Sequence, residues 1–146
     1  MSPRLPLAPL WALVATAVLF LGAVPPPPTD DAVERVEAGL RAGDPEAVLV
    51  DAGSRIEVTL FGQGGMYRRA QATHVLRDFF RRYPPSRVVF GEQATSDDGQ
   101  TAVWRYWSED GGAPLTVSVL LRETDPEASE LVWVRIDRRS TVRAGL

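Results

Sequence analysis

The sequence contains no cysteine, no lysine and no asparagine, and its 146 residues include a single histidine, His74. Without cysteine the chain has neither disulfide bonds nor a thiol nucleophile. A structural zinc site needs about four Cys or His ligands, which this chain does not have. The absence of asparagine removes any acceptor for N-glycosylation. These absences exclude most metal chemistry and covalent catalysis by cysteine.

The chain also has fewer basic residues than acidic residues. The 16 basic residues, all arginine, stand against 19 acidic residues and give a formal net charge of −3. Broad nucleic-acid binding depends on a basic surface that neutralises phosphates, so this balance argues against a nucleic-acid partner. We therefore expect no nucleic acid, no metal and no cofactor.

The first part of the chain is its one long apolar run. Residues 5–24 are mostly apolar, and the densest stretch, residues 10–21, has the length of the hydrophobic region of a signal peptide. Residues 1–24 are therefore predicted to be a cleaved signal peptide. The alternative is an uncleaved membrane anchor, because roughly 20 apolar residues span a bilayer. Both interpretations predict export to the periplasm or beyond, with membrane contact only through an uncleaved segment.

Four consecutive prolines mark the boundary of the folded part. They favour a stiff polyproline II conformation, so residues 25–29 are predicted to be a linker. Residues 30–139 have the size of one small domain. Residues 140–146 are interpreted as a C-terminal tail.

Three helices are predicted in this domain. Apolar residues recur at helical spacing over residues 33–40, and Gly43 is placed to end that helix in a left-handed conformation. Residues 44–46, Asp-Pro-Glu, are typical of a new helix start. The third helix has apolar residues at 3.6-residue spacing over residues 72–83, and two prolines stop it.

Strands follow from residues that alternate between apolar and polar. Residues 54–61 alternate in this way, residues 62–65 (Gly-Gln-Gly-Gly) are predicted to be a loop, and a short extended piece follows at residues 66–67. The period of two returns after the third helix and predicts four strands, at residues 87–95, 101–109, 115–123 and 130–138. This order predicts an α+β domain with about three helices on one face of a curved, mainly antiparallel sheet of five to six strands.

The order of elements and several short motifs together resemble a known family. Helix pair, strand, helix and long antiparallel sheet is the order of the nuclear transport factor 2-like cone, a cystatin-like α+β fold. The motifs Glu-Val-Thr (residues 57–59), Tyr-Arg-Arg-Ala-Gln-Ala (67–72), Leu-Arg-Asp-Phe-Phe (76–80) and Trp-Val-Arg-Ile-Asp (133–137) resemble an exported bacterial family called domain of unknown function 4783. The resemblance implies the fold and carries no established activity.

Alternation within the strands places several polar side chains on one face of the predicted sheet. That face gathers Glu57, Thr59, Arg105, Ser118, Trp133 and Arg135. Convergent polar groups among aromatic residues describe a pocket for a small ligand. The same pattern describes a solvated sheet face with cross-strand ion pairs, and alternation alone does not decide between them.

The same residues suggest one catalytic alternative. Glu57 would be the base of a cofactor-independent lyase or isomerase, with Arg105 or Arg135 as the partner for the developing anion. No spacing in the sequence forces these groups together. A third interpretation is a structural protein of the bacterial cell envelope with a filled cone.

Charge along the chain is uneven. Residues 68–87 hold six arginines and one acid, whereas residues 92–130 hold nine acids and two arginines. Arginines of the first group form a candidate partner surface: Arg68, Arg69, Arg77, Arg81 and Arg82. This surface is either a solvated helix face or a docking site for an acidic partner or an anionic membrane. His74 belongs to the solvent side of the same helix, where Asp78 is its i+4 neighbour, so we expect no catalytic histidine.

These observations favour a non-catalytic interaction module of the bacterial cell envelope. Its partner would be a small ligand or a protein. By analogy with other cone folds, it would form a homodimer through the outer face of the sheet.

Overall fold

A computed structural model describes residues 31–125 and 128–138. The predicted signal peptide or anchor, the proline linker and the C-terminal tail lie outside these residues. Among the described residues, no helix is both long enough and apolar enough to cross a membrane.

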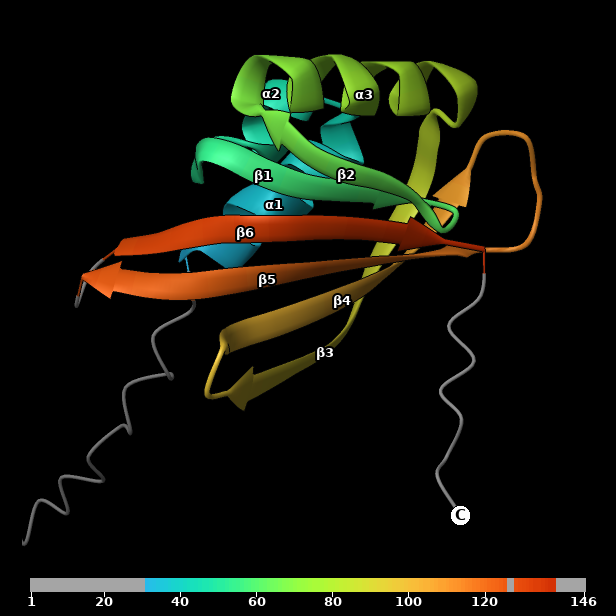
Figure 1. Cartoon of the computed structure of the whole chain (residues 1–146). Helices are drawn as coiled ribbons and strands as arrows, with labels where there is room; N and C mark the ends of the chain where they lie inside the picture. Colours follow the sequence, from blue (N-terminus) through green and yellow to red (C-terminus); the bar gives the residue numbers. More distant parts are fainter. Residues whose placement is uncertain (1–30, 126–127, 139–146) are drawn as a thin grey trace, which may run out of the picture.

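The chain forms three helices and six strands within the described residues. In order they are α1 (Asp31–Ala42), α2 (Pro45–Val48), β1 (Ala52–Leu60), β2 (Gln63–Arg68), α3 (Arg69–Arg82), β3 (Pro85–Ser96), β4 (Gly99–Ser108), β5 (Leu115–Asp125) and β6 (Ala128–Asp137). The strands form one sheet in the order β2-β1-β6-β5-β4-β3. The helices lie on one face of this curved sheet and leave the other face open (Figure 1). The predicted α+β fold is confirmed.

Local sequence signals set the ends of the helices. Gly43 has a φ of 62° directly after α1, the left-handed conformation that was expected of it. Asp44 caps α2, because its carboxylate accepts hydrogen bonds from the backbone N–H groups of Glu46 (3.0 Å) and Ala47 (3.3 Å). At the start of α3, the Gln71 side chain accepts a hydrogen bond from the Arg68 backbone N–H at 3.2 Å. Two prolines follow α3, as predicted.

The predicted Gly-rich loop is wrong in its extent. β2 begins at Gln63, and a two-residue turn of Phe61 (φ 54°) and Gly62 (φ 80°) joins it to β1. Two residues with positive φ match the right-handed twist of a tight hairpin, a turn that usually carries Asn-Gly. Phenylalanine gives no signal for this turn, so the sequence pattern pointed to a longer loop.

One pairing departs from a simple antiparallel order. β1 lies between β2 and β6 and runs parallel to β6, whereas all other neighbouring strands are antiparallel. A parallel pair needs a long connection, and the chain between β1 and β6 supplies it with α3 and four strands. The sheet is therefore mixed.

The core lies between the helices and the covered face of the sheet. Strand residues on this face are almost completely buried, including Ile56, Trp104, Tyr106, Val117 and Ile136. The helices contribute a second buried layer: Val36 and Leu40 from α1, Val48 from α2, and Leu76, Phe79 and Phe80 from α3. No polar or charged residue in the described part of the chain is fully buried. This apolar layer fixes which side chains must point to the other face.

Candidate functional site

The six residues predicted to line a pocket lie on the open face of the sheet, which we call the helix-free face. They are Glu57 and Thr59 on β1, Arg105 on β4, Ser118 on β5, and Trp133 and Arg135 on β6. Each of them alternates with buried residues of the covered face. Ser118 lies opposite Arg135, and Arg135 lies opposite Thr59.

The contacts among these side chains are electrostatic and aromatic. The Glu57 carboxylate lies 3.6 Å from the Arg135 guanidinium. The same guanidinium lies over the Trp133 ring, 4.6 Å from its centroid. A cation over an aromatic face is attracted by the ring's negative face, so Arg135 links the acid to the tryptophan. These contacts form a cross-strand cluster rather than a cavity.

A hollow of about 380 Å³ lies near the β3–β4–β5 end of the same sheet. It is lined by Gly91, Glu92, Val103, Trp104, Arg105, Ala113, Pro114, Leu115, Thr116 and Arg138. Of the six predicted pocket residues, only Arg105 lines it. The side chains of Glu57 and Arg135 are 38% and 49% exposed. The predicted residues therefore share a surface but do not share a pocket.

This geometry offers little to a catalytic mechanism. A general base gains from a site that excludes water, whereas Glu57 is partly exposed and already paired with Arg135. Arg105 lies on β4, and the sheet order separates it from Glu57 by β5 and β6. Within the described residues, no group of three or more His, Asp or Glu side chains is placed to hold a metal ion.

The helix-free face also carries apolar side chains that are not among the six predicted pocket residues. Leu120 is only 7% exposed although no helix covers it, and it lies opposite Trp133. Val103 and Trp107 on β4 are half-buried on the same face. The Arg87 guanidinium lies 4.6 Å from the centre of the Trp107 ring, as Arg135 does from Trp133. The face is therefore an apolar strip with a guanidinium stacked on each tryptophan.

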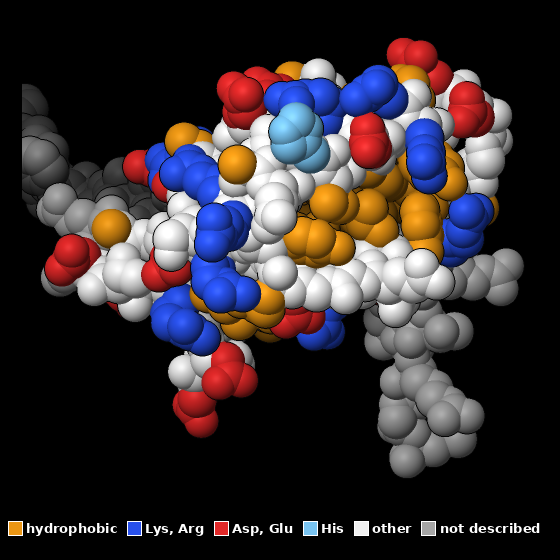
Figure 2. Space-filling view, turned by 45° about the horizontal axis from the view of Figure 1, so that its top comes forward, with side chains coloured by type: hydrophobic (Ala, Val, Ile, Leu, Met, Phe, Trp, Pro, Cys, Tyr) orange, Lys and Arg blue, Asp and Glu red, His pale blue; other side chains and the backbone are white. Residues whose placement is uncertain are grey.

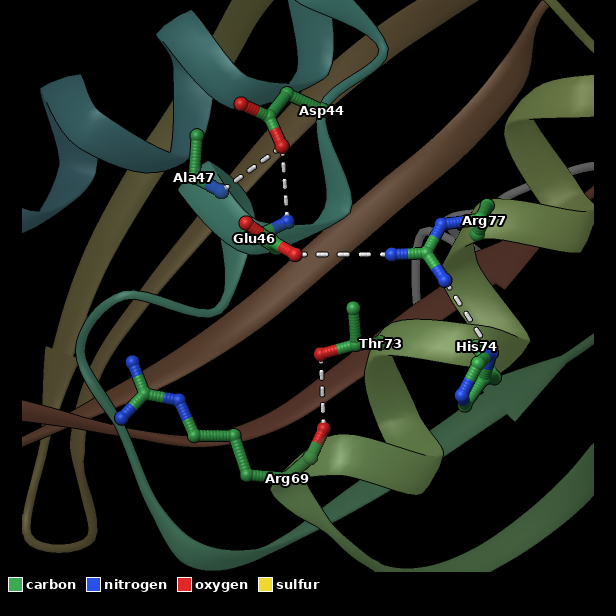
Figure 3. A network of polar contacts seen from close by, with 7 residues as sticks. All are labelled: Asp44, Glu46, Ala47, Arg69, Thr73, His74 and Arg77. Carbon is green, nitrogen blue, oxygen red and sulfur yellow. Dashed lines mark hydrogen bonds and ion pairs between the residues drawn. The ribbon is translucent and has the colours of Figure 1, made fainter.

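The arginines of α3 were predicted to form a partner surface, and three of them contact their own protein. Arg69 donates a hydrogen bond to the Val50 carbonyl at 2.8 Å. Arg77 pairs with Glu46 of α2 at 3.6 Å (Figure 3), and Arg81 pairs with Asp78 at 3.1 Å. Exposed pairs of this kind contribute up to about 1 kcal/mol each. Two of the five predicted arginines, Arg77 and Arg81, are thus paired with acids of the same chain.

His74 lies on the exposed side of α3, as predicted. Its Nδ1 atom lies 3.3 Å from Nη1 of Arg77. Figure 3 shows the Arg77 side chain directed toward His74. His74 thus contacts Arg77 rather than its i+4 neighbour Asp78, which pairs with Arg81. Arg68 and Arg82 are exposed. Neither of these two arginines forms an ion pair with another described residue.

Two aromatic residues of the core carry polar tips, and both tips have partners. The Trp104 indole N–H donates to the Glu37 carboxylate of α1 at 3.4 Å. The Tyr106 hydroxyl donates to the Tyr83 carbonyl at the end of α3. Burial raises the pKa of the Tyr106 phenol well above its ordinary value, and the nearby charge of Glu109 adds to the effect. These groups hold the helices to the sheet and do not face a ligand site.

Three helices on one face of a curved six-stranded sheet define a cone of the nuclear transport factor 2-like class. A solved nuclear transport factor 2-like protein of unknown function from Shewanella baltica OS155 has this fold. It superposes with a TM-score of 0.54 at 12% sequence identity, covering 73% of this chain and 86% of that chain.

Residues 33–132 match the family described as Domain of unknown function (DUF4783), and the chain belongs to that family. A DUF4783 family protein from Bacteroides ovatus has a TM-score of 0.63 and 16% identity, covering 70% of this chain and 91% of that chain. One from Bacteroides uniformis has a TM-score of 0.64 and 13% identity, covering 73% and 95%. No curated protein matches the chain. At these identities the likeness shows the fold alone.

Proposed function

We propose that this domain is a non-catalytic protein-interaction module that associates through the helix-free face of its sheet, with a second copy of the same chain as the partner. The observation that carries the proposal is the apolar strip of Leu120, Trp133, Val103 and Trp107 on a face that no helix covers. Leu120 is 7% exposed and the other three side chains are half-buried, so contact with a second copy would complete their burial.

Charge on this face suits a second copy. A two-fold interface brings the same patch of both subunits together, so the patch must complement itself. The helix-free face carries both signs of charge, with Glu57 beside Arg135 and Glu92 near Arg105. Tryptophan and arginine are also the residue types that contribute most to binding at interfaces. A mixed, aromatic surface therefore favours self-association over a strongly charged partner.

Sedimentation equilibrium of the full chain tests this proposal. Ser118 lies near the centre of the face, opposite Val103 and Arg135. Ser118→Arg would place like charge beside Arg135 and prevent close approach, so we expect the dimer to weaken by about 2 kcal/mol or more. Ser54→Arg is the matched control, because Ser54 is an exposed serine of β1 outside this set.

The proposal predicts a dimer in the wild type and in Ser54→Arg, and a monomer at the same concentration in Ser118→Arg. Equal association of both variants would contradict it. A monomeric wild type would leave the apolar strip without a role in self-association and would also refute the proposal.

A second candidate function rests on the hollow beside Arg105. Its volume of about 380 Å³ falls within the size of small-molecule sites, and a guanidinium lines it. A small anionic ligand would suit this charge. Isothermal titration with short-chain carboxylates, for the wild type and for Arg105→Gln, tests this candidate. If Arg105→Gln gives the same heat of binding as the wild type, Arg105 does not contact the anion.

We further propose that the domain works outside the cytoplasm, in the bacterial cell envelope. The support is the apolar N-terminal run followed by a proline linker. N-terminal sequencing of the protein produced in a bacterial host should begin near Val24 or Pro25. A chain that begins at Met1 and fractionates with membranes would favour the anchor instead.

A further inference from the structure

A second apolar surface lies on the helix side of the molecule, between α3 and the hairpin of β1 and β2. It consists of half-buried side chains from both elements: Leu60, Phe61 and Tyr67 from the hairpin, and Val75 and Tyr83 from α3 and the residue after it. We call this set the hairpin band. Figure 2 shows an apolar patch in this region with arginine side chains at both ends of it.

One end of the hairpin band is fixed by a cluster of rings. Phe61 holds a positive φ of 54°, a costly conformation for a bulky residue. Its ring packs 5.6 Å from Tyr83 and 6.4 Å from Phe79, measured between centroids. The Arg138 guanidinium lies 4.6 Å from the Phe61 ring centre and donates to the Tyr83 hydroxyl at 3.1 Å. The band is therefore preformed, with a cation at this end.

The middle of the band has room for a side chain. Gly65 of β2 lies opposite Val58, whose side chain is buried beneath the helices. A Cβ atom at Gly65 would point to the same side of the sheet, and it would meet nothing within 4 Å. The helix side of the hairpin therefore has open space at Gly65 for a side chain of a partner.

β2 also offers backbone groups to a partner. Among the described strands it is the last of the sheet and pairs only with β1. In a hairpin with a two-residue turn, alternate residues point their N–H and C=O groups away from the partner strand, and here these are Gly64 and Met66. β2 contains two glycines and no proline, and its one charged residue is Arg68 at its end, so most of the edge is accessible to strand addition.

The charge beside the band is positive. Arg82 lies seven residues after Val75 on α3, which places both on the side of the helix that faces the hairpin. Arg138 lies at the ring cluster. The one acid of this helix, Asp78, is paired with Arg81. An occupant of the band would therefore gain from negative charge.

We infer that the hairpin band is a docking site for an extended acidic segment of a partner protein. The segment would add to the free edge of β2 and place an apolar side chain in the space at Gly65. Its carboxylates would contact Arg82 and Arg138. A peptide satisfies the outward backbone groups of β2, which a membrane surface does not. This site lies on the opposite side of the sheet from the helix-free face and is independent of the proposed dimer.

Fluorescence anisotropy with the full chain tests the inference. The probe is a labelled, blocked peptide of about ten alternating Glu and Val residues, which is at the upper end of usual strand lengths. We expect it to bind, and we expect its Arg-Val counterpart and a version with N-methylated alternate residues to fail. Vesicles containing phosphatidylglycerol form a separate arm. Vesicle binding without peptide binding would overturn the inference and favour an anionic membrane.

Two pairs of variants locate the site. Gly65→Val fills the gap, and Gly112→Val makes the same change where a Cβ also meets nothing within 4 Å. Arg82→Glu reverses a charge beside the band, and Arg81→Glu does so one residue earlier, on the solvent side of the helix. We expect Gly65→Val and Arg82→Glu each to weaken peptide binding about tenfold, and their controls to leave it within about twofold. Equal effects within either pair would refute the assignment, and thermal unfolding of each variant verifies the fold.

Discussion

The two faces of the sheet are built from the same strands but have different roles. On the covered face, Trp104 and Tyr106 of β4 are completely buried, and α1 and α3 pack over them. On the helix-free face, Trp107 of the same strand and Trp133 of β6 are only half-buried, under the guanidinium groups of Arg87 and Arg135. Packing of the core explains why Trp104 and Tyr106 are aromatic. It does not require aromatic residues at Trp107 and Trp133. Aromatic residues that folding does not need are candidates for binding.

Trp104→Ala should produce the largest loss of stability. The substitution removes a large buried ring and the N–H bond to Glu37, and it leaves a cavity between α1 and the sheet. We expect the free energy of unfolding to fall by about 3–5 kcal/mol. Urea denaturation followed by circular dichroism measures it. A loss below about 1 kcal/mol would show that this face is not the tightly packed core.

Trp133→Ala should cost much less in the monomer. Its ring is half-buried under the Arg135 guanidinium, and the residue lies opposite Leu120 in the sheet. We expect a loss of about 1–2 kcal/mol in the same denaturation experiment, performed at a concentration where the chain is monomeric. Sedimentation equilibrium of this variant should show weaker association. A loss as large as that of Trp104→Ala would remove the contrast between the two faces.

Tyr106→Phe tests the buried hydroxyl of the covered face. At neutral pH we expect a loss of about 1 kcal/mol, because the hydrogen bond to the Tyr83 carbonyl disappears. Burial raises the pKa of Tyr106, so the folded state keeps this proton above pH 10 while the unfolded state loses it.

Stability of the wild type should therefore fall as the pH rises above about 10, with a contribution from this residue of up to about 1.4 kcal/mol per pH unit. Tyr106→Phe should make that alkaline decline shallower. Unfolding curves between pH 8 and pH 11 compare the two proteins. Parallel declines would show that Tyr106 does not carry the effect.

The ion pair on the helix-free face should have the smallest effect. Glu57 and Arg135 are separated by 3.6 Å and are both partly exposed. A double-mutant cycle with Glu57→Gln and Arg135→Gln should give a coupling energy below about 0.5 kcal/mol in the monomer. A coupling energy above about 2 kcal/mol would indicate a desolvated ion pair and would support Glu57 as a candidate catalytic base.

Most of the fold could be predicted from the sequence because its signals are local. Gly43, Asp44 and the prolines after α3 mark helix ends, and alternation marks the long strands. The pairing of β1 with β6 could not be predicted, since it joins segments about 70 residues apart and has no local signal. The hairpin turn was missed because its first position is Phe61 rather than the usual asparagine.

The candidate site was predicted in part for the same reason. Strict alternation places Glu57, Arg105, Ser118 and Arg135 on one face, and the structure agrees. Alternation alone would also place Leu131 on the same face as Trp133, but an irregularity in the β5–β6 register turns Leu131 to the covered face, where it is buried. A face of the sheet is enclosed only if helices pack against it. Alternation separates the two faces but does not show which of them the helices cover.

Native mass spectrometry of the purified chain tests the central claim most directly, because one spectrum reports both the number of subunits and any bound small molecule. If the helix-free face is a self-association surface, the spectrum should show two copies without added mass, and Ser118→Arg should show one. A single wild-type copy that carries a small molecule would contradict the account and favour a ligand site instead.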